Sequence, residues 1–174
     1  MTSSPPAAPG EPEVALVPAR PVEDEGRLVM AWRNDPDTLA ASFRGQPRTW
    51  PAFLDEYRGY FAGPPPGPCF GVAGGERVAF LRFRPCADPE GRGRSTCDIS
   101  INVAPVARGR GLGRALIAAA TAEALRHFQV VLAEIKPGNA ASRRAFLAAG
   151  YRAIAAGTHD VAGEAVPVER YLAP

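Results

Sequence analysis

The chain has 174 residues, a formal net charge of +2 at pH 7, and hydrophobic and charged contents of 46% and 22%. These values predict one globular domain and give no reason to expect a nucleic-acid partner. The sequence contains no apolar run that is long enough to span a bilayer. The N-terminus lacks the layout of a signal peptide and the three cysteines fit no zinc pattern, so we expect a cytoplasmic protein without a metal site.

The first half of the chain predicts strands in a meander and two helices. Residues 1–13 are rich in Ser, Pro and Ala and are expected to be a disordered tail, so a single domain is expected to span residues 14–174. The apolar periodicity predicts, in order, a strand at 14–19, helices at 23–34 and 51–61, and strands at 69–73 and 77–83. Thr49 is expected to cap the second helix, and Gly74 and Gly75 to close a hairpin.

The second half predicts strands that alternate with helices. A polar loop at 85–94 precedes a strand at 95–103. The elements that follow are a helix at 112–127, a strand at 130–135, a helix at 139–149, and strands at 151–155 and 166–171 around a Gly/His/Asp loop. Gly150 is expected to end the last helix in a left-handed conformation. This order predicts a mixed α/β fold, with a sheet covered by helices on both faces.

The most informative segment is a glycine-rich turn between a predicted strand and a predicted helix. It consists of Arg108, Gly109, Arg110, Gly111, Leu112 and Gly113. Amides at the start of a helix lack intrahelical acceptors and carry partial positive charge, so they favour phosphate. The glycines let a ligand approach the main chain closely. Positive charge is added by Arg108, Arg110 and Arg114.

Two common phosphate-binding motifs do not fit this turn. A P-loop closes with Gly-Lys-Ser/Thr, whereas the only lysine is Lys136. A dinucleotide fingerprint would have a third glycine where Arg114 stands. The turn instead resembles the coenzyme A pyrophosphate loop of GNAT N-acetyltransferases, Arg/Gln-x-x-Gly-x-Gly/Ala, which here reads Arg108-x-x-Gly111-x-Gly113.

Further elements resemble the same family in the same order. They are Asn139-x-x-Ser142, Phe146 and Gly150-Tyr151. The resemblance covers roughly residues 14–172 and is nearest to the ribosomal-protein-type and amino-sugar acetyltransferase branches. It implies a central mixed, mostly antiparallel sheet, acetyl-CoA as cosubstrate and coenzyme A as product.

The resemblance also implies where the cofactor lies. The central strand should separate from its neighbour, with the pantetheine arm in the gap beside Ile101 and Val103. A strand kink near residues 102–104 would expose the Val103 amide, which would then donate to the thioester carbonyl. Asn139 is expected both to cap its helix and to contact pantetheine, and Ser142 and Phe146 are expected to complete the site.

The strand before the turn has one polar face. Asp98, Ser100 and Asn102 alternate with apolar residues, and in a sheet covered on both sides such a row predicts a cleft. We expect Asp98 to remove the amine proton, directly or through water, with Asn102 beside it in the catalytic site. The alternative is that Asp98 only bonds a neighbouring loop. Phe146 stands where the family often has a tyrosine, and a phenyl ring cannot protonate the departing thiolate.

A second segment, Trp32-Arg33-Asn34, is by itself the end of a helix. It resembles a segment that borders the acceptor pocket in the same two branches. The resemblance implies substrate binding by these three residues, and it allows Arg33, Asn34 and Arg44 to hold an acidic acceptor such as a nucleotide-linked amino sugar. A purely structural role for each residue is the alternative. His127 and His159 are too isolated in the sequence to predict a catalytic pair.

We therefore expect an acyl-CoA-dependent N-acyltransferase that acetylates a primary amine of a small molecule, with an amino sugar favoured. A peptide N-terminal amine is the second candidate acceptor. An acyl-CoA-binding module without catalysis and a structural domain without a ligand are the alternatives. A homodimer is compatible with the sequence, and neither nucleic acid nor membrane is an expected partner.

Overall fold

The computed structural model describes residues 12–173, so the expected tail, apart from residues 12 and 13, lies outside the described residues. The strands are β1 (Ala15–Pro18), β2 (Cys69–Ala73), β3 (Glu76–Cys86), β4 (Thr96–Val103), β5 (Val130–Ile135), β6 (Arg152–Val161) and β7 (Glu164–Ala173). The helices are α1 (Glu23–Arg33), α2 (Pro36–Ala41), α3 (Ala52–Gly59), α4 (Gly113–Ala124) and α5 (Ala140–Ala148), with a 3-10 turn, η1 (Pro105–Ala107), before α4.

In the described part of the chain, seven strands form one sheet in the order β1-β2-β3-β4-β5-β7-β6. The pair β4 and β5 is parallel, because the α4 crossover returns the chain in the same direction. The other neighbouring strands are antiparallel. The expected mixed, mostly antiparallel α/β architecture is therefore confirmed.

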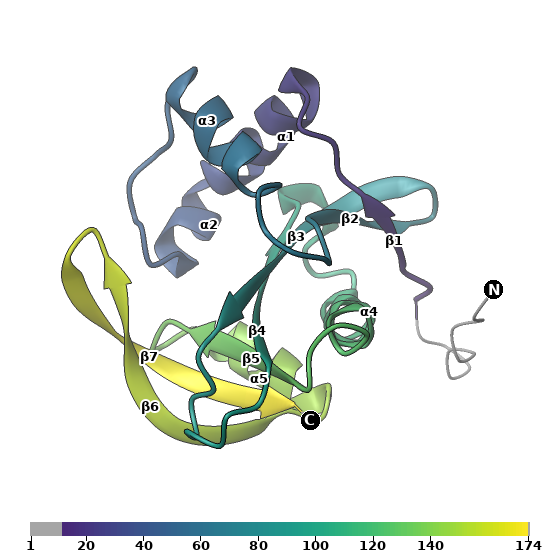
Figure 1. Ribbon diagram of the computed structural model, residues 1–174. Coiled ribbons are helices and arrows are strands. Elements are labelled where there is room, and N and C mark those ends of the chain that lie inside the picture. The colour runs from purple at the N-terminus through teal and green to yellow at the C-terminus, as the bar shows by residue number, and fades with distance from the viewer. Residues whose placement is uncertain (1–11, 174) are drawn as a thin grey trace.

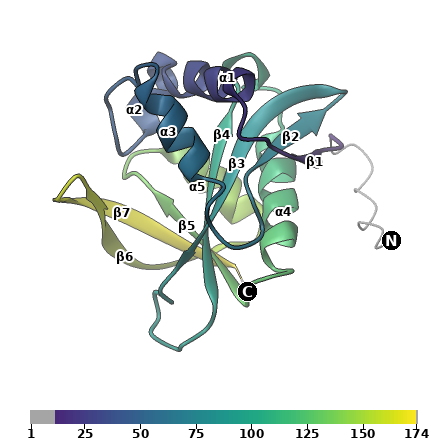
Figure 2. The ribbon, with the colours of Figure 1, turned by 45° about the horizontal axis from the view of Figure 1, so that its top comes forward.

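Helices cover both faces of this sheet, α1 and α3 on one face and α4 on the other (Figures 1 and 2). Phe80 of β3 points to the first face, where its ring centroid lies 5.8 Å from that of Tyr57 in α3. Gly71 of β2 points to the other face, where a Cβ would lie 2.4 Å from Cδ2 of Leu116 in α4. The approach of α4 to the sheet therefore requires a glycine at position 71.

The short helix α2 was not predicted, because no element was expected between the helices at 23–34 and 51–61. Helix α1 does end at Arg33, but Asp35 then caps a new helix by accepting a hydrogen bond from the Thr38 amide at 3.1 Å. Pro36 fits the first turn of this helix, where its missing N–H has no acceptor to lose.

Two other expectations about local structure are wrong. The Thr49 side chain does not cap α3; its carbonyl accepts a hydrogen bond from the Phe53 amide at 2.9 Å instead. Residues 156–165, expected to be a loop, belong mostly to the long β6–β7 hairpin, whose turn is at Ala162 and Gly163. Pairing along β7 outweighs the turn preference of the glycine and aspartate in this segment.

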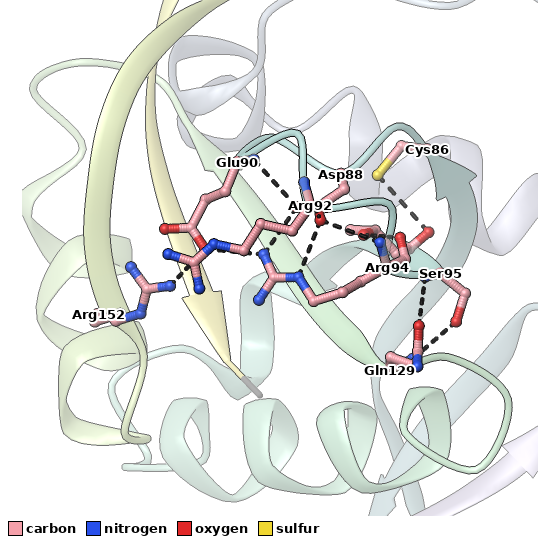
Figure 3. Close-up of polar contacts among 9 residues, drawn as sticks. Cys86, Asp88, Glu90, Arg92, Arg94, Ser95, Gln129 and Arg152 are labelled. Atoms are coloured by element: carbon pink, nitrogen blue, oxygen red, sulfur yellow. Dashed lines mark hydrogen bonds and ion pairs between the residues drawn. The ribbon is translucent and has the colours of Figure 1, made fainter.

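The loop between β3 and β4 is organised around one carboxylate, that of Asp88 (Figure 3). It accepts hydrogen bonds from the amides of Glu90, Arg92 and Arg94 at 3.1, 3.1 and 3.2 Å. The Arg94 guanidinium adds two more, at 2.9 and 2.8 Å. Hydrogen bonds from Arg94 above all, and then from the backbone amides, hold the pKa of Asp88 well below its usual range.

Candidate active site

The turn between η1 and α4 presents a row of free amides. Gly109 and Gly111 have φ values of 71° and 73°, and a Cβ at either position would meet no atom within 4 Å. In residues 12–173, no group accepts a hydrogen bond from the amides of residues 109–113. Helix α4 starts directly after this turn, and its Leu116 amide donates to the Leu112 carbonyl at 2.9 Å. The turn can therefore donate several hydrogen bonds to an anion at the positive end of α4.

The arginines around this turn contact carboxylates. Arg108 Nη1 lies 2.7 Å from Asp35 Oδ2, and its other Nη donates to the Thr38 hydroxyl. Arg110 Nη1 lies 3.6 Å from the carboxylate of Glu76. The charge that these two arginines bring to the turn is thus partly balanced within the protein, and Arg108 joins the turn to the start of α2.

The gap expected beside the central strand lies between β4 and β5. Their parallel pairing ends at Asp98 and Leu132, although β4 continues to Val103 and β5 to Ile135. Beyond this point the two strands border a cleft of about 660 Å³, which is also lined by α1, the α2–α3 segment, α5 and β6.

The Val103 amide points into this gap without any kink in β4. The strand keeps a regular register with β3 from Thr96 to Val103. The next amide, that of Ala104, donates to the Val78 carbonyl of β3 at 2.8 Å. Because successive strand amides point to opposite sides, the amides of Val103 and Ile101 face away from β3, toward the vacated side of β4. The expected kink is therefore absent, and strand separation alone exposes these donors.

The polar face of β4 forms part of the cleft, as its alternation predicts. Asp98, Ser100 and Asn102 all line it. Cross-strand pairing places Arg84 opposite Asp98, and Arg84 Nη2 donates to Asp98 Oδ2 at 2.6 Å. Burial raises the pKa of the Asp98 carboxyl, and the Arg84 guanidinium opposes this rise without cancelling it. The Asp98 carboxylate is therefore a stronger base than an ordinary aspartate side chain.

The start of α5 forms the opposite side of the gap. Asn139 caps this helix as expected, since its side-chain oxygen accepts a hydrogen bond from the Ser142 amide at 3.1 Å. All three predicted residues, Asn139, Ser142 and Phe146, line the cleft. The Phe146 ring packs edge-on against Tyr151 at 5.0 Å, so it also belongs to the core. Gly150 has a φ of 90°, the left-handed conformation expected after α5.

A second carboxylate lies on the β5 side of the cleft. Glu134 Oε2 is 2.7 Å from His159 Nδ1, and Glu134 Oε1 accepts from Arg170 Nε at 2.9 Å. The His159 ring stacks on Phe43 with centroids 5.0 Å apart. His159 is thus not isolated in space, although nothing near it in the sequence indicates its partners.

The three predicted acceptor residues occupy different environments. Arg33 lines the cleft, as does Arg44. Trp32 is 9% exposed and packs edge-on against Phe70 in the core, so its ring is not part of the cleft wall. Asn34 holds the α2–α3 segment by exchanging two hydrogen bonds of 2.7 Å with the backbone of Arg48.

Several residues of the cleft were not predicted from the sequence, in particular Arg82, Tyr60, Glu134 and His159. A signal for the first was available. Arg82 stands between apolar residues in the strand predicted at 77–83, and Arg84 continues the alternation just beyond it, so an extended strand would place both arginines on one face of the sheet.

The described residues also constrain other classes of site. No group of three or more His, Cys, Asp or Glu side chains among them is arranged to hold a metal ion. None of the helices within residues 12–173 is both long and apolar enough to cross a membrane.

The comparisons with known proteins agree with this geometry. The acetyltransferase (GNAT) family model matches residues 25–151, so the chain belongs to the GNAT acetyltransferase family. The family that the sequence resembles is thereby confirmed. No curated protein matches the sequence.

Solved structures share the fold at low sequence identity. The aminoglycoside acetyltransferase AAC(6')-Ib in complex with coenzyme A is 16% identical over 92% of this chain and 94% of that chain, with a TM-score of 0.73. Spermidine N-acetyltransferase from Vibrio cholerae, in complex with CoA and spermine, is 13% identical over 92% and 94%, with a TM-score of 0.73. Ribosomal-protein-alanine N-acetyltransferase from Brucella melitensis is 21% identical over 91% and 98%, with a TM-score of 0.69.

Proposed function

We propose that the protein transfers an acetyl group from acetyl-CoA to a primary amine of a small molecule, with an amino sugar as the favoured acceptor. One observation carries this proposal: the turn with the free amides of residues 109–113 follows β4 in the chain, and β4 separates from β5 before its end to border the cleft. This arrangement supports a cosubstrate bound by the turn, with its extended arm in the gap and the acceptor in the cleft.

The residues that would hold acetyl-CoA fit its chemistry. The amides of the turn suit the pyrophosphate, because they are donors without acceptors at a helix N-terminus. The amides of Ile101 and Val103 suit the pantetheine arm, and Asn139, Ser142 and Phe146 border the same gap. When bound, the cosubstrate supplies an activated acyl thioester.

The proton balance assigns a role to Asp98. An alkylammonium has a pKa of about 10, so the acceptor must lose a proton before its nitrogen can attack the acyl carbon. The Asp98 carboxylate takes this proton through water molecules of the cleft, and Asn102 lies on the same face of β4, nearer to Val103. The Val103 amide donates to the carbonyl oxygen, where negative charge develops as the C–N bond forms.

The departing thiolate receives no proton from Phe146, whose ring has no donor. The nearby Tyr151 hydroxyl forms a 2.6 Å hydrogen bond with the Thr121 hydroxyl of α4, and burial raises the pKa of Tyr151. The C–S bond therefore breaks to give a thiolate that leaves as the anion or takes its proton from water.

A peptide N-terminal amine is the second candidate acceptor. The similarity in fold to the ribosomal-protein-alanine enzyme supports it, as does the similarity of Trp32-Arg33-Asn34 to that branch. Assays of acetylation must decide between an amino sugar and a peptide N-terminus as acceptor, because a shared fold at this sequence identity does not define the substrate.

The test is the release of free coenzyme A, followed with a thiol reagent in mixtures of acetyl-CoA and candidate amines. Amino sugars and their phosphates, spermidine, and a peptide beginning with alanine form the panel. We expect thiol release with an amino sugar and none with the Gly111→Glu variant. Binding of acetyl-CoA without thiol release with any amine would instead identify a non-catalytic acyl-CoA-binding module.

A further inference from the structure

Three buried polar atoms have no hydrogen-bond partner, and the residues that carry them line the same cleft. They are Nε of Arg33, Nε of Arg82 and Nδ2 of Asn102, and within residues 12–173 no other buried side-chain nitrogen or oxygen atom lacks a partner. All three residues line the cleft beside the proposed reaction centre. All three atoms are donors, so the group that would satisfy them is an acceptor.

The three donors converge although they come from different elements. Arg82 pairs with Ser100 across β3 and β4, so its side chain shares a face of the sheet with Asn102. The Arg82 guanidinium lies 4.4 Å from the centroid of the Tyr60 ring, and that of Arg33 on α1 lies 5.7 Å from the same centroid. Tyr60 thus brings two guanidinium groups together next to the polar row of β4.

The protein balances these two charges only in part, through the more distant charges of Glu56 on both arginines and of Asp98 on Arg82. No ion pair is formed by Arg33 or Arg82 in the part of the chain that the structure describes. Burial first, and then the neighbouring charge of Arg82, lower the pKa of Arg33 to about 10. Burial likewise lowers the pKa of Arg82. Two partly desolvated cations side by side are costly unless an anion joins them.

The carboxylates of the cleft have other partners. Glu56 Oε1 accepts from the Tyr60 hydroxyl, and its Oε2 lies 3.8 Å from Nε of Arg48. Asp98 bonds Arg84, and Glu134 bonds His159 and Arg170. The lining of the cleft contains seven arginine and lysine side chains but only five aspartate and glutamate side chains. The cleft therefore has an excess of positive charge.

We propose that the acceptor carries an anionic group, a carboxylate or a phosphate, which binds between Arg33, Arg82 and Asn102. This inference rests on the proposed function and narrows the acceptor to an amine that also bears an acidic group. Such a group bonds both guanidiniums, which balances their charge. A polycation such as spermine would instead meet like charge at the same place.

The first experiment compares matched acceptors that differ only in the anionic group. The pairs are glucosamine 6-phosphate with glucosamine, and alanine with alaninamide, each assayed by coenzyme A release. We expect kcat/KM to be about tenfold or more higher for the anionic member of at least one pair. The pair that shows the preference identifies phosphate or carboxylate. Equal or faster acetylation of both neutral amines would overturn the proposal.

Amino-acid substitutions then test whether Arg82 and Arg33 cause the preference for the anionic acceptor. Arg82→Met keeps an apolar stem against Tyr60 but removes the charge, and we expect it to abolish the preference while the KM for acetyl-CoA stays unchanged. Arg82→Lys should restore part of it. The matched control is Arg126→Met, because Arg126 is an exposed arginine of another surface, and it should retain the full preference. Arg33→Met provides a second test if Arg82→Met does not fold.

A binding measurement separates this inference from the proposed function. Inorganic phosphate and acetate are titrated calorimetrically into protein saturated with coenzyme A, so that the turn at residues 109–113 is already filled. We expect binding of at least one ion by the unmodified protein and by Arg126→Met, and none by Arg82→Met. Binding of this kind without acetylation of any amine would refute the proposed function but keep the anion site. No binding, or equal binding by Arg82→Met, would overturn the anion site.

Discussion

Arg84 Nη2 donates a 2.6 Å hydrogen bond to Oδ2 of Asp98, and the two residues face each other across β3 and β4. Burial raises the pKa of the Asp98 carboxyl, whereas Arg84 lowers it, so the two effects oppose each other at the proposed base. By lowering the pKa of Asp98, the Arg84 guanidinium keeps this carboxylate deprotonated to a lower pH.

Replacing Arg84 by methionine should move the pH dependence of the reaction. Loss of the guanidinium removes an effect that lowers the pKa of Asp98, so that pKa rises further. The acidic limb of the kcat/KM profile should consequently shift to higher pH, with activity lost earlier as the pH falls. An unmoved limb, or one that shifts to lower pH, would show that Asp98 is not the titrating base.

Asp98→Asn and His159→Asn should have different effects on the same profile. Without a carboxylate at position 98, we expect kcat to fall about a hundredfold or more and the acidic limb to disappear, while coenzyme A binding is kept. His159→Asn removes the partner of Glu134 and the stacking on Phe43, but it should leave the limb in place. If the limb disappears in His159→Asn instead, the base is His159, oriented by Glu134.

Gly111→Glu should abolish coenzyme A binding in a calorimetric titration. The substitution introduces a side chain and a negative charge where the free amides are expected to bind the pyrophosphate, and it strains a residue whose φ is 73°. Gly91→Glu is a matched control, because Gly91 has a φ of 66° and equally open surroundings in the distant β3–β4 loop. The control should lose comparable stability but retain affinity. Unchanged affinity in Gly111→Glu would exclude this turn as the cofactor site.

Gly71→Ala should destabilise the fold by about 1–3 kcal/mol, because the new methyl group would overlap Leu116 of α4. Chemical denaturation of the two proteins measures the difference in the free energy of unfolding. Gly67→Ala is the control, since no atom lies within 4 Å of a Cβ there, and it should change stability little. Equal stability of the two variants would mean that α4 shifts away from the sheet at little cost.

Asp88→Asn should weaken the β3–β4 loop in a pH-dependent way (Figure 3). The pKa of Asp88 is lowered in the folded protein, so its contribution is fully present above the unfolded-state value of about 4 and is lost as the pH falls through the folded-state value. The unfolding free energy of the unmodified protein should therefore exceed that of Asp88→Asn at pH 7. The difference should shrink as the medium is acidified below pH 4, and a constant difference would contradict the assignment.

The elements of the fold that depend only on residues close together in the chain could be predicted from the sequence. The glycine-rich turn, the Asn139 cap and the β2–β3 hairpin depend on backbone conformation and on bonds to residues a few positions away. Helix α2 and the length of β6 could not be predicted. Asp35-Pro36 suits the start of a helix as well as a turn, and β6 is extended by its pairing with β7.

The features of the candidate site are likewise of two kinds, those predicted from the sequence and those that depend on tertiary contacts. The alternation of Asp98, Ser100 and Asn102 by itself determined a polar strand face, because side chains of a strand must alternate between two sides. Only the tertiary structure decided what that face meets. Arg33 joins Arg82 over Tyr60, His159 meets Glu134, and Arg108 contacts Asp35, each across segments distant in sequence. Local chemistry fixes which groups a strand or turn presents, whereas the packing of α1, α3 and β6 around the separated strands fixes their partners and charge.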